Sequence, residues 1–153
     1  MDTIAVLCRK YTNLAPADIA VIQGMSTVLC AIANWEEADI FVDCPCRDGD
    51  AIVVAEAKPD GAPSSYEKSV VGLLARKENE PAVARTLRLG VATKQMKALT
   101  QENRRTIQSV EPIKNGAGRV IGALVREQRM DERRQASDRL HFSDSDPAKI
   151  ANA

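Results

Sequence analysis

The clearest pattern in the chain is an alternation of apolar and polar residues on both sides of an Asp-Gly step. Residues 39–45 and 51–58 form two β-rich runs around Asp48-Gly49, and this arrangement favours a β-hairpin. Strand alternation assigns one face of the first run to Ile40, Val42 and Cys44, and the other to Asp39, Phe41 and Asp43. In the second run, the same alternation assigns one face to Val53, Ala55 and Ala57, and the other to Ile52, Val54, Glu56 and Lys58.

Apolar residues at three- and four-residue spacing before the hairpin indicate an amphipathic helix from Pro16 to about Trp35. Pro16 suits the first helical position, and Asp18 places negative charge in the first turn. We expect Trp35 to be a packing anchor, and a short helix capped by Asp2 or Thr3 to come first. The expected stripe, which covers one face of the hairpin, is Ile19, Ile22, Met25, Ser26, Leu29, Ile32 and Ala33.

The rest of the chain predicts one more helix, a second hairpin and a polar end. A helix should begin at Pro81 and end at Gly90. Residues 106–113 and 119–125 flank an Asn-Gly step and form a hairpin, in which Pro112 predicts an edge or a bulge. The polar segment 94–103 suits a cover or an edge element, and a polar helix should begin at Glu127.

This element order predicts an α+β fold with a central antiparallel sheet. The helix expected over residues 16–35 should cover one face of the sheet, and the other, half-charged face is either exposed to solvent or the floor of a polar pocket. The long segment 59–104 carries little core pattern and is typical of a lid or a binding wall. We assign residues 1–130 to one domain and residues 131–153 to a polar helical linker and tail.

Composition narrows the class of protein. The 153 residues suit one domain, with 44% hydrophobic and 27% charged residues. Lys+Arg and Asp+Glu both number 21, so no net charge draws the chain to nucleic acid or to anionic lipid. The start of the chain lacks the features of a signal peptide, and no apolar run reaches the ~20 residues of a membrane span. We therefore expect a cytoplasmic domain with neither a nucleic-acid nor a membrane partner.

The charged face of the first hairpin is the candidate site. Asp43, Glu56 and Lys58 would form the charged floor of a pocket, and Tyr66 and Gln108 would add hydrogen bonds. An amine would suit the carboxylates and an anion would suit Lys58, while a solvated face with weak ion pairs is the alternative. The only histidine, His141, lies in the polar tail, so we expect no catalytic residue, no metal ligand set and no cofactor.

Two further functions stay open from the residues alone. The cysteines Cys8, Cys30, Cys44 and Cys46 fit buried or incidental thiols, with a thiol-based redox or metal sensor as the alternative. The helices at both ends would also suit a purely structural dimerisation module.

Several stretches of the chain resemble one family in order and at consistent spacing, over about residues 16–130. The family is the GAF-like N-terminal sensor domain of soluble two-component histidine kinases, which has ethanolamine-responsive relatives. The stretches are DIFVDCP (39–45), DGD (48–50), VAEAKP (54–59), YEKSVVG (66–72), KENEPAV (77–83), LTQEN (99–103), VEPIKN (110–115) and GRVIG (118–122).

The resemblance implies a GAF-like fold, in which N- and C-terminal helices pack on one face of the sheet and a ligand pocket lies on the other. It also implies a small-molecule ligand, a homodimer and a kinase core in the full-length protein. Relatives of this kind work with response regulators of the RNA-binding antiterminator type. The chain lacks a phosphoacceptor helix and a glycine-rich ATP lid, so it would be an excised sensor domain or a truncated protein that cannot autophosphorylate. It would itself be no enzyme, and its mechanism would be a shift of population in which a ligand closes the segment 59–104 and biases the terminal helices.

Overall fold

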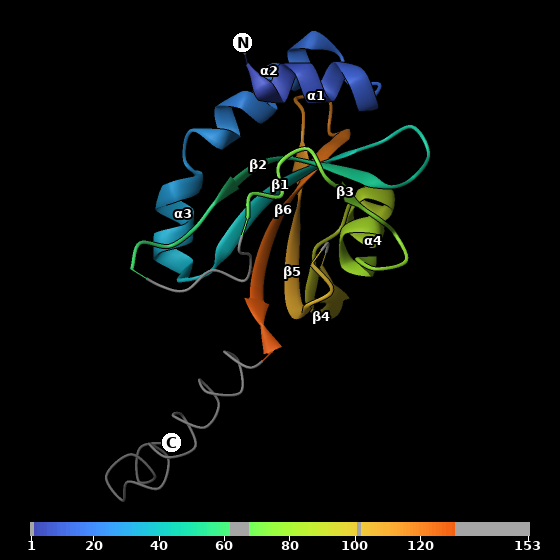
Figure 1. Cartoon of the computed structure of the whole chain (residues 1–153). Coiled ribbons are helices and arrows are strands. Elements are labelled where there is room, and N and C mark those ends of the chain that lie inside the picture. Colours follow the sequence, from blue (N-terminus) through green and yellow to red (C-terminus); the bar gives the residue numbers. More distant parts are fainter. Residues whose placement is uncertain (1, 62–67, 101, 131–153) are drawn as a thin grey trace, which may run out of the picture.

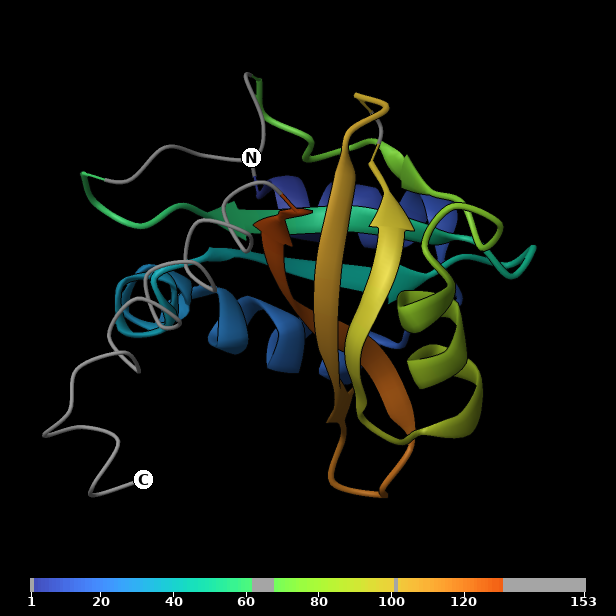
Figure 2. The same ribbon diagram turned by 90° about the horizontal axis from the view of Figure 1, so that it is seen from below.

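The computed structural model describes residues 2–61, 68–100 and 102–130, and a six-stranded antiparallel sheet forms its centre. The strands follow the order β3-β2-β1-β6-β5-β4. The sheet is strongly twisted, so that β1 and β2 cross β4 and β5 at a steep angle (Figures 1 and 2). The strands are β1 (Asp39–Pro45), β2 (Ala51–Ala57), β3 (Leu74–Ala75), β4 (Thr93–Leu99), β5 (Arg105–Lys114) and β6 (Val120–Arg129). The predicted α+β fold with an antiparallel sheet is confirmed.

Three helices cover one face of the sheet. They are α1 (Thr3–Tyr11), α2 (Pro16–Ser26) and α3 (Leu29–Glu36). Asp2 caps α1 by accepting a hydrogen bond from the backbone N–H of Ile4 at 2.9 Å. Pro16 begins α2 as expected, and Asp18 accepts a hydrogen bond from Asn115 at 2.9 Å, which ties this helix end to the β5–β6 turn.

The helix predicted over residues 16–35 is two helices in the structure. They are bent by 46° at Thr27 and Val28. At the bend, the hydroxyl groups of Ser26 and Thr27 donate to the carbonyls of Gln23 and Gly24, and backbone bonds tighten to a three-residue spacing. These local bonds compete with the helical ladder. The predicted stripe nevertheless holds, since Ile19, Ile22, Leu29 and Ala33 are buried against the sheet.

Trp35 corrects one expectation. Its side chain is 88% exposed on α3, so it packs no core. The buried face of α3 is supplied by Leu29 and Ala33.

The exposure of Trp35 leads to a direct prediction. Trp35→Ala should change the free energy of unfolding by no more than about 0.5 kcal/mol, as is usual for exposed positions. Urea unfolding followed by circular dichroism measures the change, and the fluorescence of this single tryptophan should be that of an indole in water. A much larger loss, or blue-shifted emission, would contradict the exposed position.

A bulge in β2 corrects the predicted faces of the first hairpin. Val42 pairs with Ala55 and Asp43 with Val53, so Val54 is an extra residue in β2. Before the bulge Ile52 and Val54 face the helices, and after it Ala55 and Ala57 do. Glu56 therefore lies on the opposite face together with Val53, and not with Ile52 and Val54 as alternation predicted.

The second face is covered by α4 (Pro81–Leu89) and by the segment before it. Helix α4 begins at Pro81 and ends at Gly90, whose φ of 71° is left-handed, as predicted. Ala82 and Val83 pack with Phe41, Val110 and other residues into a second core cluster. Figure 2 shows α4 alongside β4, which is the edge strand that the polar segment 94–103 suggested.

The end of β6 differs from expectation, whereas β5 has one of the two features that Pro112 predicted, a bulge. Strand β6 continues to Arg129, so the polar helix predicted from Glu127 does not begin there, and the rest of that helix lies outside the described residues. Pro112 is not on an edge strand, because β5 lies between β4 and β6. Its missing N–H is tolerated because β4 pairs with β5 only as far as Val110, and a bulge follows at Ile113.

Arg47 fastens the β1–β2 turn to α1. Its guanidinium donates to the carbonyls of Lys10 and Thr12, both at 2.8 Å, and to the side-chain oxygen of Asn13 at 2.9 Å. These carbonyls lie at the end of α1, where backbone acceptors lack helical partners and a positive charge is favoured. The turn and the first helix are thus held together.

No single helix in residues 2–61, 68–100 and 102–130 is long and apolar enough to cross a membrane. The bent pair α2 and α3 reaches that threshold only when the two are taken together, by length and composition.

Candidate functional site

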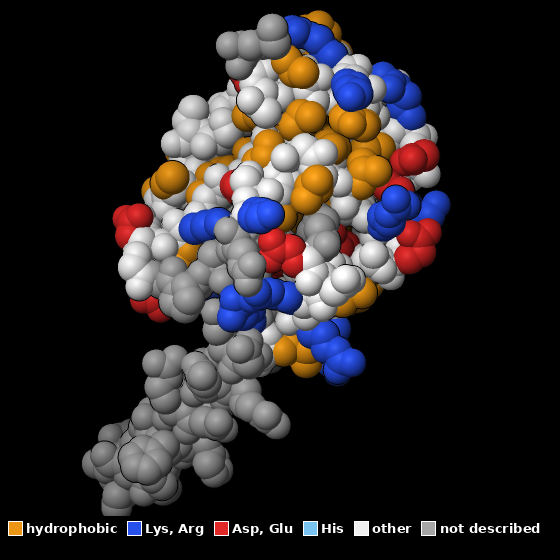
Figure 3. Space-filling view, in the orientation of Figure 1, with side chains coloured by type: hydrophobic (Ala, Val, Ile, Leu, Met, Phe, Trp, Pro, Cys, Tyr) orange, Lys and Arg blue, Asp and Glu red, His pale blue; other side chains and the backbone are white. Residues whose placement is uncertain are grey.

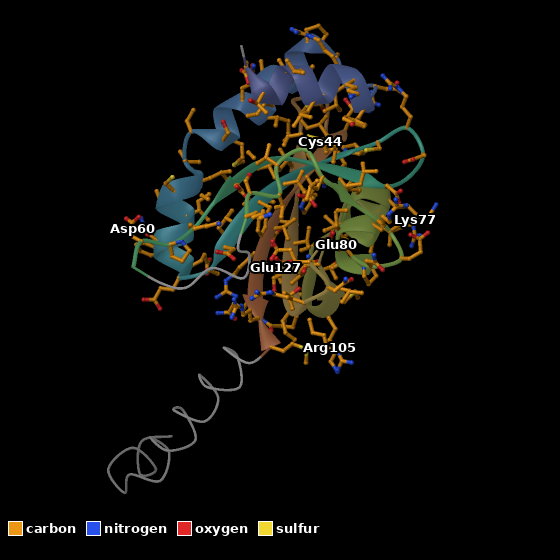
Figure 4. All side chains as sticks on the ribbon, viewed as in Figure 1. Cys44, Asp60, Lys77, Glu80, Arg105 and Glu127 are labelled. Atoms are coloured by element: carbon orange, nitrogen blue, oxygen red, sulfur yellow. The ribbon has the colours of Figure 1, made fainter. Side chains whose placement is uncertain are left out.

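Four buried polar side chains meet between the sheet and the start of α4. Asp43 comes from β1, Gln108 from β5, Glu127 from β6 and Glu80 from the residue that precedes α4. None is more than 5% exposed, and Figure 4 shows Glu80 and Glu127 in the interior between α4 and the sheet. We call these four residues the acidic cluster.

Gln108 is the centre of the acidic cluster. Its Nε2 donates to Oε1 of Glu80 at 2.8 Å and to Oε1 of Glu127 at 2.6 Å. The hydroxyl group of Thr106, which is also buried, donates to the same Glu127 oxygen at 3.3 Å. One amide therefore joins two carboxylates that belong to different elements.

Two oxygens of the acidic cluster have no hydrogen-bond partner in the described part of the chain. They are Oδ1 of Asp43 and Oε1 of Gln108, and both atoms are buried. A buried acceptor without a donor costs about 1–3 kcal/mol. Such atoms are therefore rare in native cores and need an explanation in function.

Burial favours the protonated form of two carboxyl groups of this cluster, those of Asp43 and Glu80. The pKa of Asp43 is raised well above its usual range, first by burial and then by the nearby charges of Glu80 and Glu127. The pKa of Glu80 is raised to about 8, chiefly by burial; the hydrogen bond from Gln108 opposes this shift, and the charge of Glu127 adds to it. The cluster therefore carries fewer negative charges at neutral pH than its three carboxyl groups suggest.

The residues proposed from the sequence are only partly brought together. Asp43 and Gln108 both belong to the acidic cluster. Glu56 is half-buried, and its Oε2 accepts a hydrogen bond from the backbone N–H of Val70 at 3.2 Å. It therefore holds the covering segment, residues 68–80, which precedes α4 on this face of the sheet. Lys58 lies just past the end of β2, and no described hydrogen bond or ion pair joins it to the cluster. Tyr66 lies outside the described residues.

Sequence reasoning missed Glu80 and Glu127. Glu127 was assigned to a polar helix, although the spacing of Ala123, Val125 and Glu127 continues the alternation of a strand, and Ala123 and Val125 are core residues. Glu80 precedes a proline at a helix start, which is a common place for an exposed acid. Its burial follows from the packing of α4 on the sheet, and no local pattern signals it.

A hollow of about 520 Å³ opens beside Glu80, which is the one member of the acidic cluster among its lining residues. It is lined by polar groups of Asn79 and Thr100, by Arg76, and by the apolar side chains of Leu74 and Leu99. The volume is in the range of small-molecule sites. Glu80 is thus the member of the cluster that an incoming molecule meets first.

A larger hollow of about 760 Å³ lies on the other side of α4, next to the β1–β2 turn. Pro45, Pro81, Ala84, Leu87 and Met96 form its apolar surface, with Lys77, Arg85 and Arg88 among the polar side chains around them. We call it the basic-rimmed groove. Lys77 lies on the outer side of α4 (Figure 4), where Figure 3 shows basic and acidic side chains next to one another.

Two of the four thiols, Cys44 and Cys46, have little nucleophilic character. The sulfur atoms of Cys8 and Cys44 are 4.0 Å apart in the core between α1 and β1. This contact, together with burial, raises the pKa of Cys44 far above that of a free thiol. Burial and the charges of Asp48 and Asp50 raise the pKa of Cys46 to about 11. Both thiols are therefore protonated at neutral pH, which disfavours reactions that need a thiolate.

The described residues contain no group of three or more His, Cys, Asp or Glu side chains arranged to hold a metal ion.

A family model matches residues 4–145, and its description reads histidine kinase PdtaS, GAF domain. A solved sensor region of a sensor histidine kinase superposes with a TM-score of 0.64 at 20% identity over 84% of the chain. The chain spans 42% of the length of that protein. A search of curated proteins finds no match.

Two transcriptional regulators share the fold at lower identity. The regulator YaiJ has a TM-score of 0.54 at 11% identity, over 76% of this chain and 84% of its own. The inducer-binding domain of PobR from Acinetobacter, a double mutant in complex with 3-hydroxybenzoic acid, has a TM-score of 0.51 at 10% identity, over 71% and 83%. These identities establish a shared fold alone.

Proposed function

Because the chain belongs to the GAF domain family of the histidine kinase PdtaS, we propose that it is a cytoplasmic, ligand-sensing regulatory domain of such a kinase. The kinase core and its catalytic residues would belong to the full-length parent, and this chain would have no enzymatic activity of its own. The sensed ligand would be a small molecule, and the domain would act as a homodimer.

The observation that carries the proposal is the pair of buried oxygens without donors, Oδ1 of Asp43 and Oε1 of Gln108. A ligand that brings hydrogen-bond donors would satisfy both atoms and would gain from the proximity of Glu80 and Glu127. The acidic cluster therefore selects a small, donor-rich and neutral or cationic molecule over an anion. The hollow beside Glu80 supplies the entry.

The signal would begin at α4. Glu80 immediately precedes α4 and is bonded through Gln108 to β5 and, through the same amide, to Glu127 on β6. A ligand that takes over these hydrogen bonds would shift the population of α4 positions, and the N-terminal helices together with residues beyond β6 would transmit the change. Glu56 and Val70 join the covering segment to the same face.

A ligand screen tests the proposed site. We expect some member of a panel of small amines, amino alcohols, amides and polyols to raise the melting temperature of the 153-residue protein. A cationic member of this panel would favour the ionised form of Asp43 and bond to it with charge assistance. Asp43→Asn keeps the shape of the side chain and cannot ionise, so it should weaken the binding of that member at least about tenfold by calorimetry, since a charge-assisted hydrogen bond is worth about 1.5–3 kcal/mol.

Glu111→Gln is the matched control, because Glu111 is an exposed residue of β5 that pairs only with Lys94 at the surface. It should bind like wild type. If every compound that binds does so equally well to Asp43→Asn, the acidic cluster is not the sensing site. If carboxylic acids are the only compounds that stabilise the domain, the predicted preference of the acidic cluster for ligands with hydrogen-bond donors is wrong.

A thiol-based sensor is the less favoured function. The raised pKa values of Cys44 and Cys46 argue against a reactive thiolate at either position.

A further inference from the structure

The basic-rimmed groove is distinct from the hollow beside Glu80, because the two share no lining residue, and no member of the acidic cluster lines the groove. The inner face of α4 packs Ala82, Val83 and Thr86 into the interior, whereas Ala84 and Leu87 line the groove. At about 760 Å³, the groove matches the volume of sites that hold drug-sized molecules. The proposed sensing role makes no use of it.

The surface of the groove is suited to an apolar body. Pro45 and Pro81 contribute rigid rings to its lining, and the half-buried side chains of Leu87 and Met96 pack against the second core cluster. Methionine adapts its shape to different partners. An aromatic ring or a short aliphatic chain would therefore find a complementary surface.

The charges around the groove favour a single negative charge. Three cations, Lys77, Arg85 and Arg88, face two acids, Asp50 and Glu78, which leaves a net charge of +1. Oδ1 of Asp50 already accepts a hydrogen bond from the backbone N–H of Lys77 at 3.0 Å. The side chains of Lys77 and Arg88 form no hydrogen bond or ion pair with any described residue.

Arg85 is held ready for an anion. One nitrogen of its guanidinium, Nη1, donates to the carbonyl of Ala92 at 3.2 Å and to the hydroxyl group of Thr93 at 2.9 Å. Thr93 in turn shares a 3.0 Å hydrogen bond with Thr86 of α4. These bonds hold the planar group in place and lower the entropic cost of binding a carboxylate.

We infer that the basic-rimmed groove is a second ligand site, specific for a monoanionic carboxylate with an apolar body. The carboxylate binds Arg85 with help from Arg88 or Lys77, and the apolar body lies on Pro81, Leu87 and Met96. A dianionic phosphate ester is disfavoured, because it would bring excess negative charge next to Asp50 and Glu78.

The site is tested with benzoate and hexanoate as probes, and with benzamide and hexanamide as neutral counterparts of equal shape. Titrations followed by amide NMR shifts should show both acids perturbing residues 77–88 and Met96, with the amides binding at least about fivefold more weakly. Benzyl phosphate should bind more weakly than benzoate. Equal binding of acid and amide, or stronger binding of the phosphate, would overturn the inference.

Variants locate the carboxylate. Arg85→Lys keeps the charge and removes the planar fork, and it should weaken benzoate binding about tenfold. Arg88→Gln alters an exposed residue and should weaken it less, whereas Arg9→Gln on α1 should have no effect. Asp43→Asn should bind benzoate like wild type. The test of the groove therefore does not depend on whether the acidic cluster is the sensing site. Wild-type affinity in both Arg85→Lys and Arg88→Gln would refute the groove as the site.

Discussion

At pH 8.5, Glu80→Gln should be more stable than the wild-type domain by several kcal/mol, whereas at pH 5 the two should be nearly equal. Glu80 is buried in the acidic cluster, and its pKa in the folded protein is raised from 4.5 to about 8. Glutamine keeps the acceptor for Gln108 and cannot ionise. The variant therefore removes the cost of a buried charge and preserves the hydrogen bond.

The direction of the pH dependence follows from linkage. A carboxyl group whose pKa is raised by folding binds its proton more tightly in the folded state. Its stabilising contribution is complete below pH 4.5 and is lost as the pH rises to about 8, at up to about 1.4 kcal/mol for each pH unit. The raised pKa of Asp43 acts in the same direction. The helix dipole favours a negative charge at the start of α4, but by only about 0.3–1 kcal/mol, so burial prevails.

Urea unfolding at pH 5, 6.5 and 8.5 measures how the free energy of unfolding depends on pH. Urea is uncharged, so it does not screen the charges that cause the dependence. The wild-type midpoint should fall steadily, and the midpoint of Glu80→Gln should fall much less. Glu78→Gln is the control, because Glu78 is exposed two residues earlier and should leave the wild-type slope intact. A wild-type midpoint that is constant or rises with pH would refute the buried, protonated cluster.

Ile22→Ala should cost about 2–5 kcal/mol, the range for removing a large buried aliphatic side chain. Ile22 is fully buried on α2. Its Cδ1 lies only 3.0 Å from the position that a Cβ on Gly122 of β6 would take. The absence of a side chain at Gly122 thus makes room for Ile22, and truncation would leave a cavity between α2 and the sheet.

Val21→Ala is the matched control for this contact. Val21 is the preceding residue of the same helix and is 39% exposed, so its truncation should cost well under half as much. Thermal and urea unfolding give both values. Equal losses in the two variants would mean that α2 does not pack on the sheet through Ile22.

Most of the fold was predictable because its signals are local. The Asp-Gly and Asn-Gly turns, the stripe from Ile19 to Ala33, and the Pro81 start and Gly90 end of α4 each depend on a few neighbouring residues. The break at Thr27 and Val28 was missed because apolar spacing continues through it. The bulge at Val54 was missed because a continuous run of apolar residues conceals a change of phase.

The candidate site was less predictable because it depends on long-range packing. Asp43 and Gln108 stood out as polar residues in strands, but their neighbours Glu80 and Glu127 come from segments 28 and 19 residues from Gln108. Whether an acid becomes buried there depends on where α4 lies on the sheet. The family resemblance, now confirmed by the match over residues 4–145, predicted a pocket on this face of the sheet and did not indicate these two residues.

The β1–β2 turn has a mechanical consequence for the whole domain. Within four residues, Arg47 grips the end of α1, while Gly49 and Asp50 border the groove beside α4 and Asp50 holds the backbone of Lys77. Helices on opposite faces of the sheet are therefore linked around its rim, in addition to any path through its core. A displacement of the segment that leads into α4 would therefore be transmitted to α1 through the β1–β2 turn, without a movement of the sheet between them.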